Sequence, residues 1–496
     1  MVDGHPWWTA LLDRDPLTML SVPRDVVVRA APRVSCEKSL GRRRTVPVIY
    51  VQGTHYEVGF DVGRTFSSII KEFLTSFGNL RDFEREYKTD AGRAAYDKTL
   101  ANMKKRYPYY VKEMQGVADG ANVPFHQLFL LQMDDLIGTI NDNHIPRNDT
   151  GGCSSIGIKN PSHTLLGHTE DAANETLNHF YIMSAHIIPT KEDREHGAVE
   201  ERFASLCYAG HMPGYTMGFN ENGLVFSINT LSPLILKAGN TPRTFITRAM
   251  LASKSFSDAE NILRDEGLGI GNGFSVNMIW TTSWGHRELY NVEVSPDLKA
   301  DRSVLNVQKY DKEPLVHCNK YQRTNVTEVT GAIIDSSVAR LRVIHSYPTP
   351  RGRGDLAQIL SDTSDPKYKL FQEQPDDVIK TIAAAEHTPM ILPPYMRGPP
   401  ESPCHAVSRL FEHFGARQIT TVFKKSCSSQ FMTVASPSCS GLVWSLGSNF
   451  DCVPPPPTYS TGIFDVDKRT WSIYINKPNS SEPVAVLPIT FSSLDY

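Results

Sequence analysis

The chain has 496 residues, of which 40% are hydrophobic and 21% are charged, and its formal net charge is −3. This composition is that of a globular protein, and the small net charge excludes a general attraction to nucleic acid or to anionic membranes. The chain has no run of about 18 apolar residues that would form a transmembrane helix. Residues 1–20 carry charges that a secretory signal lacks, so we expect a cytoplasmic protein.

The cysteine pattern gives no sign of a metal centre. The eight cysteines lie at scattered positions and form no Cys-x-x-Cys pair and no His/Cys spacing of the kind that binds zinc. We therefore expect neither a metal nor an organic cofactor.

The first third of the chain is predicted to be an extension followed by helices. Residues 1–44 have a mixed composition and end in a basic run, which predicts an N-terminal extension. The first regular element is expected at Val46–Gln52. A helix should follow from Thr54, where a capping box with Glu57 precedes apolar residues spaced by three and four. A second helical region runs from about 91 to 130. We expect breaks in it at Pro108, Gly120 and Pro124.

After residue 153 the pattern changes to short apolar or alternating runs separated by turns. Asn220–Gly223 predicts a hairpin turn, and Thr244–Ala252 and Ala259–Asp265 predict helices. Helices, then strands, then helices indicate a layered α+β domain with a mostly antiparallel sheet. The predicted strands are Ser155–Ile158, Leu165–His168, Phe180–Ile188, Ala204–Cys207, Tyr215–Phe219, Leu224–Ile228, Ser275–Thr281 and Leu289–Val294.

Residues 386–460 differ from the rest of the chain. They are rich in proline, hold four of the eight cysteines and show no sustained periodicity. The flanking residues 376–383 and 462–467 would join into a continuous strand and turn if the segment were removed. We therefore predict that it is poorly ordered, either as an inserted loop or as an error in the gene model.

The strongest chemical signal is a cysteine after two glycines. Cys153 follows Gly151-Gly152 directly and precedes an apolar run. A thiol with a pKa of about 8.5 needs a base to become a good nucleophile. If the bond between Gly152 and Cys153 is cut, the freed α-amine, with a pKa of about 7.7–8.0, can supply that base. Glycine there tolerates a strained backbone and leaves room for the thiol. The same residues also fit a small buried cysteine without a catalytic role.

Several further motifs, taken with this one, resemble a known family. They are Gly152–Ser155, Gly167–Asp171, the hairpin Gly218–Leu224 leading to Asn229, Val316–Asn319 and Tyr107–Pro124. Together they resemble the acyl-CoA:isopenicillin-N acyltransferase family, peptidase family C45, and the last is similar to that family's pro-segment. The resemblance covers about residues 46–385 and resumes at about 461. Within the family, the chain is similar to the insect enzymes that hydrolyse β-alanyl amides of biogenic amines.

The resemblance implies an N-terminal-nucleophile hydrolase with an αββα sandwich, made as a precursor that cleaves itself between Gly152 and Cys153. Residues 45–152 would be the helical pro-segment and become the α chain. Residues 153–385 and 461–496 would form the catalytic domain in the β chain. The mature protein would then be the α chain bound to its own β chain, and a homo-oligomer of such pairs stays open.

The resemblance also assigns roles to single residues. Cys153 would be the nucleophile and, through its α-amine, the base. Asp171 matches an acidic residue that orients the nucleophile, and its carboxylate would raise the pKa of the amine. Asn319 matches the amide of the oxyanion hole, where one donor is worth about 2.7–4 kcal/mol. Asn229 is either a second polar contact or an asparagine that makes local backbone hydrogen bonds.

Other residues fit the family less well or suggest a different base. Fungal members place an arginine where this chain has Gln372, which weakens a prediction of antibiotic acyl transfer. His168, His211 and His317 could each pair with the cysteine as a base, although a histidine beside a strand is more often structural.

The function implied is that of an amidohydrolase. It would cleave small-molecule substrates such as β-alanyl-dopamine or β-alanyl-histamine to β-alanine and the free amine, without a nucleic-acid or membrane partner. One alternative is an acyltransferase, in which an amine resolves the thioester. The other is an uncleaved, catalytically inactive binding protein, disabled by residues 386–460.

Overall fold

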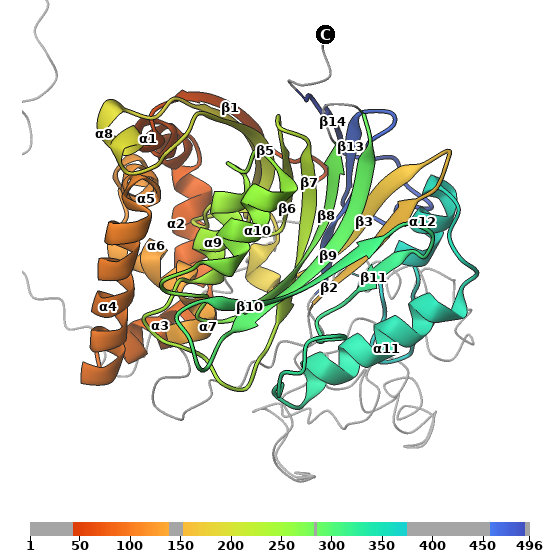
Figure 1. Cartoon of the computed structure of the whole chain (residues 1–496). Coiled ribbons are helices and arrows are strands. Elements are labelled where there is room, and N and C mark those ends of the chain that lie inside the picture. Colours follow the sequence, from red (N-terminus) through yellow and green to blue (C-terminus); the bar gives the residue numbers. More distant parts are fainter. Residues whose placement is uncertain (1–42, 138–151, 282–284, 374–456, 492–496) are drawn as a thin grey trace, which may run out of the picture. The chain divides into compact units, whose positions relative to one another are not determined.

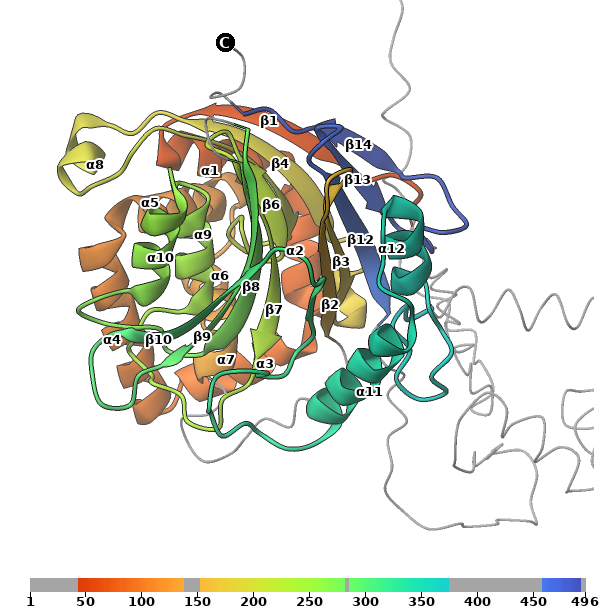
Figure 2. The same ribbon diagram turned by 45° about the vertical axis from the view of Figure 1, so that its right-hand side comes forward.

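The computed structural model describes residues 43–137, 152–281, 285–373 and 457–491, which contain helices and two β-sheets (Figures 1 and 2). All of them belong to one unit of the chain, Arg42–Tyr496. Nearly all of the predicted extension 1–44 and most of the predicted insertion 386–460 lie outside the described residues. Within these ranges, every helix is too short or too polar to cross a lipid bilayer.

The chain enters through a strand and continues as a series of helices. These elements are β1 (Val48–Gly53), α1 (His55–Thr65), α2 (Ser67–Ser76), α3 (Gly78–Tyr87), α4 (Asp90–Arg106), α5 (Pro108–Ala121), α6 (Phe125–Gln132) and α7 (Asp134–Ile137). Helix α1 begins with the predicted capping box, in which Thr54 and Glu57 each accept the other's backbone N–H. Pro108 stands in the first turn of α5, where its missing N–H costs no helical bond.

Glycines explain how α1 and α5 pack so closely. An added Cβ at Gly59 would lie 2.0 Å from the carbonyl oxygen of Glu113, and one at Gly120 would lie 2.2 Å from that of Phe60. The break predicted at Gly120 is one residue early, since α5 ends at Ala121, and Gly120 still packs against α1. Its lack of a side chain lets the two helix backbones touch.

The larger sheet has the strand order β1-β4-β5-β6-β7-β8-β9-β10, and every neighbouring pair is antiparallel except β1 with β4. The predicted hairpin turn connects β6 to β7, and Gly223 in it has a φ of 104°, which favours glycine. The elements are β4 (Phe180–Ile187), α8 (Lys191–Glu195), β5 (Glu201–Tyr208), β6 (Met217–Asn220), β7 (Leu224–Leu231), α9 (Arg243–Met250), α10 (Phe256–Arg264), β8 (Gly273–Thr281), β9 (Arg287–Pro296) and β10 (Ser303–Tyr310).

The smaller sheet has the order β11-β2-β3-β12-β13-β14. Strand β12 begins at Thr458, so the last residues of the predicted insertion 386–460 belong to this sheet. Its elements and the helices beside it are β2 (Cys153–Lys159), β3 (Thr164–Asp171), the 3-10 turn η1 (Asn174–Thr176), β11 (Leu315–His317), α11 (Ala332–Ser346), α12 (Arg353–Leu360), β12 (Thr458–Asp465), β13 (Thr470–Tyr474) and β14 (Ala485–Pro488).

Three buried clusters hold these elements together as four layers. One lies between the larger sheet and helices that include α1, α2, α5, α6, α9 and α10. A second fills the space between the two sheets, with Leu206, Phe464 and Trp471 among its members. The third lies between the smaller sheet and helices α11 and α12. The views agree with this order, since α11 and α12 lie on the side away from α1–α7 (Figures 1 and 2). The predicted α+β class is confirmed.

The sequence located the elements up to residue 296 better than those after it. Each predicted strand overlaps an observed one, and the two predicted helices correspond to α9 and α10. Strands β10, β11, β13 and β14 and helices α11 and α12 were not predicted. The expected antiparallel sheet proves to be two sheets, because β2 and β3 pair with the distant strands β11 and β12.

A buried ion-pair network connects the N-terminal helices to the larger sheet. Arg248 of α9 donates to Glu113 of α5 at 2.8 Å and to Glu201 of β5 at 2.6 Å, and His55 of α1 lies 2.9 Å from Glu113. Burial alone would raise the pKa of Glu113, but Arg248 and His55 outweigh it and lower the pKa from 4.5 to about 2. The stabilisation from this carboxylate is therefore complete above pH 4.5 and is lost as the pH falls toward 2.

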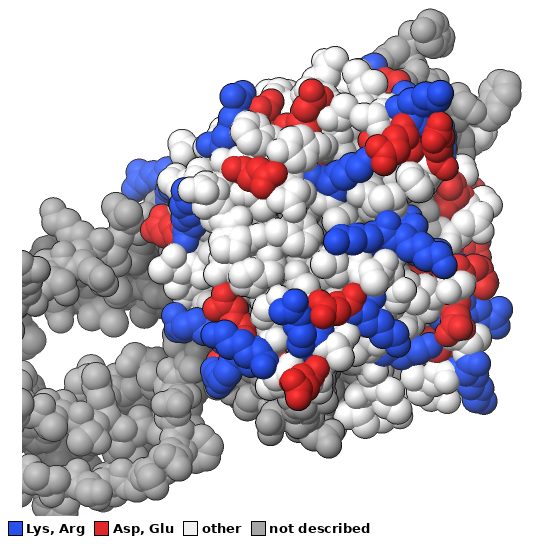
Figure 3. Space-filling model, turned by 90° about the vertical axis from the view of Figure 1, so that its left-hand side faces the viewer, with Lys and Arg blue, Asp and Glu red and all other residues white. Residues whose placement is uncertain are grey.

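The ion pairs on the outer surface are exposed to solvent, unlike the buried network around Arg248. In Figure 3, which views the side at the left of Figure 1, acidic and basic side chains are intermixed. The pair Arg93–Asp97 in α4 is an example of an exposed pair, with side chains 56% and 57% exposed. Such pairs contribute about 0.3–0.5 kcal/mol to stability.

We expect Arg248→Met to lower the free energy of unfolding by about 3–5 kcal/mol, because it leaves two carboxylates buried without their cation. The measurement is urea unfolding. It is made in a chain that also carries Cys153→Ala, because removing the thiol prevents any cleavage that depends on it and keeps the protein a single polypeptide. The matched control Arg93→Met breaks an exposed pair and should change stability by less than about 0.5 kcal/mol. Equal effects of the two substitutions would contradict the role given to Arg248.

Candidate active site

Cys153 is the first residue of β2, and the strand ladder determines what surrounds it. Strand β2 pairs antiparallel with β3 so that Cys153 lies opposite Glu170. Because side chains alternate along a strand, Cys153 and Ser155 share one face and Ser154 has the other. Ser155 hydrogen-bonds Asn229 of β7, so the face with Cys153 is the one that meets the larger sheet. The thiol is therefore buried between the sheets.

The thiol contacts a carboxylate that is held in place by other side chains. Cys153 Sγ lies 3.6 Å from Oε2 of Glu170. The same oxygen lies 2.8 Å from Nε2 of His168, and the hydroxyl of Tyr208 donates to Oε1 at 2.7 Å. His168 Nδ1 is 2.8 Å from the hydroxyl of Ser155. In this geometry the thiol hydrogen-bonds Glu170 rather than any of the three histidines considered as bases.

This environment keeps the thiol neutral. Burial raises the pKa of Cys153 well above its ordinary value, and the negative charges of Glu170 and Asp171 raise it further. Arg340 and a hydrogen bond with Asn319 act in the opposite direction without overcoming the burial. The uncut chain thus holds Cys153 as a thiol, which is a poor nucleophile until a base removes its proton.

Two side chains from outside the strand pair hold the backbone of Cys153. Its N–H donates to Oδ1 of Asn319 at 2.7 Å, and its carbonyl accepts from Nη1 of Arg340 at 2.7 Å. Arg340 also donates to Asn319 Oδ1 at 2.8 Å, while Asn319 Nδ2 donates to the carbonyl of Thr230 at 3.0 Å. The predicted residue Asn319 therefore lies beside Cys153, and one of the two N–H groups of its amide donates to the carbonyl of Thr230.

No sequence pattern had indicated Arg340, Glu170 or Tyr208 as residues of the site. Arg340 is fully buried in α11, on the same face as Ser336, Val343 and Ile344. A charged residue on the apolar face of a helix is unusual, since burying it costs free energy unless it is paired. That pattern was the available signal for Arg340.

Gly152 has no room for a side chain. An added Cβ would lie 2.2 Å from Asn319 Oδ1 and 2.5 Å from Arg340 Nη2. Gly152 does not have a positive φ, so tight packing rather than backbone strain explains the glycine. Its carbonyl accepts the backbone N–H of Asp171 at 3.0 Å. Gly151, the other glycine of the motif, lies outside the described residues.

Asp171 is the last residue of β3 and lies beside the peptide bond between Gly152 and Cys153. Its carboxylate accepts the hydroxyl of Thr458 at 2.5 Å, and that hydroxyl accepts the backbone N–H of Gln372 at 2.8 Å. Gln372, the residue expected to replace the arginine of fungal relatives, thus lies close to Asp171. The predicted contact of Asp171 with the nitrogen of Cys153 stays a prediction, because in the uncut chain that nitrogen donates to Asn319.

Asn229 also lies at the site, in β7 of the larger sheet. Its Oδ1 accepts from Ser155 at 3.0 Å and from Asn277 at 2.7 Å. Its Nδ2 is buried and has no hydrogen-bond partner among the described residues. A buried N–H donor without a partner is costly, so this amide is available for a ligand oxygen.

The two other histidines have structural surroundings. His317 lies 3.0 Å from Glu293 and 2.6 Å from the carbonyl of Cys318. His211 packs against the ring of Tyr215, and burial lowers its pKa to about 4. His317 is explained by hydrogen bonding and His211 by packing.

One group of side chains has the composition of a metal site. Cys153, His168 and Glu170 each have a ligand-type atom, and these atoms lie within 4.8 Å of one another. The hydrogen bonds described above already account for all three, so their arrangement is explained without an ion.

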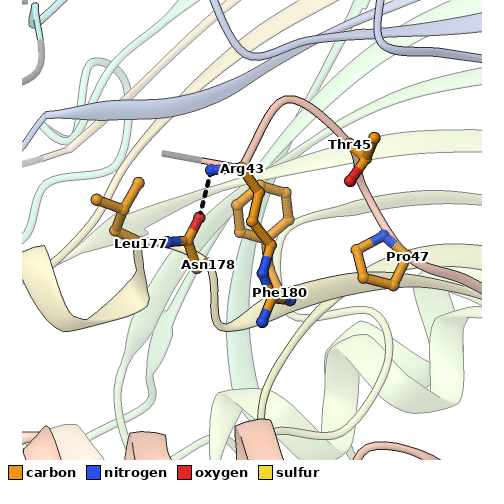
Figure 4. A pocket seen from close by; sticks show the side chains of 6 residues that line it. All are labelled: Arg43, Thr45, Pro47, Leu177, Asn178 and Phe180. Atoms are coloured by element: carbon orange, nitrogen blue, oxygen red, sulfur yellow. Dashed lines mark hydrogen bonds between the residues drawn. The ribbon is translucent and has the colours of Figure 1, made fainter. Parts of the chain in front are cut away.

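A surface hollow lies elsewhere (Figure 4). The backbone N–H of Arg43 donates to Oδ1 of Asn178 there at 2.8 Å, which attaches the start of the described chain to the turn before β4. Cys153, Asp171 and Asn319 are not among its lining residues. These are Arg43, Thr45, Pro47, Leu177, Asn178 and Phe180.

Comparison with known proteins adds two findings. A family model described as acyl-coenzyme A:6-aminopenicillanic acid acyl-transferase matches residues 158–390. The chain is also similar to the beta-alanyl-dopamine/carcinine hydrolase of Drosophila melanogaster. The two are 44% identical over 358 residues, which cover 71% of this chain and 92% of the relative.

We expect Gly152→Ala, made in the Cys153→Ala chain, to lower the free energy of unfolding by about 1–3 kcal/mol, because the new methyl group displaces Asn319 and Arg340. Gly354→Ala in α12 is the matched control, since its added Cβ meets no atom within 4 Å. A helical glycine replaced in open space should leave stability equal or raise it by up to about 1 kcal/mol. Urea unfolding of both variants tests the packing, and tolerance of Gly152→Ala would refute it.

Proposed function

The chain belongs to the acyl-coenzyme A:6-aminopenicillanic acid acyl-transferase family, and from that premise we propose that it is a self-processing cysteine amidohydrolase for β-alanyl amides of biogenic amines. The observation that carries the proposal is the position of Cys153. It begins a central strand, its backbone nitrogen is held by Asn319, and the carbonyl before it is held by the N–H of Asp171. The four layers are, on this proposal, the αββα sandwich of an N-terminal-nucleophile hydrolase.

Processing would proceed by attack of the Cys153 thiol on the carbonyl carbon of Gly152. The backbone N–H of Asp171 already donates a hydrogen bond to the carbonyl oxygen of Gly152, on which negative charge would develop during the attack. The C–N bond breaks, the Cys153 nitrogen takes up a proton as an amine, and water hydrolyses the thioester to a new carboxyl end at Gly152. Residues 45–152 would then be the α chain, and the β chain would begin at Cys153.

Cleavage would change the chemistry around the thiol. The N–H that donates to Asn319 Oδ1 would become an amine that can accept a proton from the sulfur of the same residue. Asn319 would keep the amine in place, and the nearby Asp171 carboxylate would favour its charged form. The base that the neutral thiol lacks in the uncut chain would thus be made by the cut.

Substrate hydrolysis would use the same groups. The thiol attacks the β-alanyl carbonyl, the α-amine passes the proton to the leaving amine, and water releases β-alanine from the thioester. Asn229 and Asn319 are the candidates for the oxyanion. Asn229 Nδ2 has no hydrogen-bond partner among the described residues, whereas Asn319 Nδ2 uses one of its two N–H groups on the carbonyl of Thr230. The substrate class comes from the Drosophila relative, whose name states that it hydrolyses beta-alanyl-dopamine and carcinine.

We expect the purified wild-type chain to contain a fragment whose first residue is Cys153, and the Cys153→Ala chain to stay whole. Intact mass and N-terminal sequencing are the measurements. Cys207→Ala is the matched control, because Cys207 is a buried cysteine in the cluster on the helical side of the larger sheet. It should be cut like the wild type. If the wild-type chain stays whole, self-processing is excluded and the uncleaved binding protein becomes the better hypothesis.

We expect the cut protein to release β-alanine from β-alanyl-dopamine and β-alanyl-histamine, and Cys153→Ala to lower this rate at least about 1,000-fold, because the covalent step is lost. Adding an excess of a second amine distinguishes hydrolysis from acyl transfer. Free β-alanine as the main product supports the hydrolase, and β-alanyl amides of the added amine as the main product would support the acyltransferase.

A further inference from the structure

Glu170 is a buried carboxylate at the nucleophile that the proposed reaction does not use. Among the described ion pairs it has His168 as a partner and no lysine or arginine. Arg340, a nearby cation, donates to the carbonyl of Cys153 and to the hydroxyl of Ser154, which points to the opposite face of β2. Arg243, a second buried cation near Cys153, lies beside Tyr215 and Asp134. Burying a carboxylate without a lysine or arginine partner costs free energy of folding. Such a group is therefore a candidate for binding a positively charged ligand.

The proposed substrates carry a matching positive charge. A β-alanyl amide has a primary amine two carbons from the carbonyl that the thiol attacks, and this amine is an ammonium ion at neutral pH. We propose that Glu170 binds the ammonium group of the β-alanyl moiety and so selects acyl groups with an amine at that position. The inference rests on the proposed function and adds the residue that recognises the acyl half of the substrate.

The distances permit this arrangement. Attack places the carbonyl carbon about 3–3.5 Å from Sγ. With single bonds of about 1.5 Å, the ammonium nitrogen lies roughly 3–4 Å from that carbon. A charge-assisted hydrogen bond to a carboxylate is about 2.8 Å long. Sγ and Glu170 Oε2 are 3.6 Å apart. The carbonyl carbon can therefore contact Sγ while the ammonium nitrogen of the same β-alanyl group contacts Oε2.

The hydrogen bonds on Glu170 leave an acceptor position for this ligand. An ionised carboxylate has about four acceptor sites. Tyr208 occupies one, His168 another, and the Cys153 thiol a third at 3.6 Å. The thiol loses its proton when it attacks, so its position becomes available to the ammonium group as well. Tyr208 and His168 meanwhile keep the carboxylate aimed at the sulfur.

Binding of the ammonium group would also assist the chemistry. The charge of Glu170 contributes to the raised pKa of the thiol. An ammonium ion beside Glu170 neutralises that charge, so the sulfur ionises more easily when a β-alanyl group is bound. The charged and titratable groups that interact with the sulfur in the described structure are Glu170, Asp171, Arg340, His168, Tyr208 and Arg243. Of these, Glu170 is the group that hydrogen-bonds the thiol directly.

The test compares β-alanyl-dopamine with N-butyryl-dopamine, in which a methyl group replaces the ammonium ion at equal chain length. We expect the wild-type protein to prefer the β-alanyl compound by at least 10-fold in kcat/KM. We expect Glu170→Gln to lower this ratio by about 10- to 100-fold, the effect of one charged hydrogen bond. Cys207→Ala, on the helical side of the larger sheet, should keep the ratio of the wild type.

Each outcome has a definite meaning. A purely structural role for Glu170 would lower both rates together and leave the ratio unchanged, which would overturn the inference. Equal wild-type rates on the two compounds would also overturn it, and that result does not depend on whether the variant folds or is processed. If the wild type hydrolyses neither compound although it is cut at Cys153, the proposed substrate class fails instead.

Discussion

The site depends on the ladder between β2 and β3. This antiparallel pair lies in the middle of the smaller sheet, with β11 on one side and β12 on the other. It places Cys153 opposite Glu170 and brings the N–H of Asp171 to the carbonyl of Gly152. A shift of register by one residue would turn the thiol to the opposite face of the sheet, toward α11 and α12. The apolar clusters on both faces of the smaller sheet resist such a shift.

The buried polar groups at this end of the strand pair form one connected system. Arg340 lies in α11, Asn319 follows β11, and Glu170 and Asp171 are the last two residues of β3. Each of them has hydrogen-bond partners in this system. Such a system is stable only if its members are satisfied together. The proposed cut before Cys153 would change this system, because it would convert the backbone amide nitrogen of Cys153, which lies at its centre, into an amine. The free energy to hold this polar cluster comes from the apolar layers around it.

The N-terminal helices are held against the larger sheet by contacts that do not depend on the peptide bond before Cys153. On the proposed cleavage they would no longer be joined to β2 by a peptide bond. They would stay attached through the apolar cluster on the larger sheet and through Glu113, whose charge is paired with Arg248 of α9. The close crossing of α1 and α5, made possible by Gly59 and Gly120, fixes the position of Glu113 against that sheet. The proposed cleavage would thus alter the candidate active site without releasing the helices.

The sequence alone determined the features that depend on near neighbours in the chain. The capping box at Thr54, the hairpin at Gly223, most strands and the Gly-Cys step at residue 153 are local patterns, which is why they were recognised. Only the tertiary structure decided which groups meet the thiol. Arg340 reaches Cys153 across 187 positions of sequence. Glu170 became a candidate only when the strand register placed it opposite the cysteine. Spacing along the chain does not reveal such contacts, because the packing of two sheets and the pairing of distant strands create them.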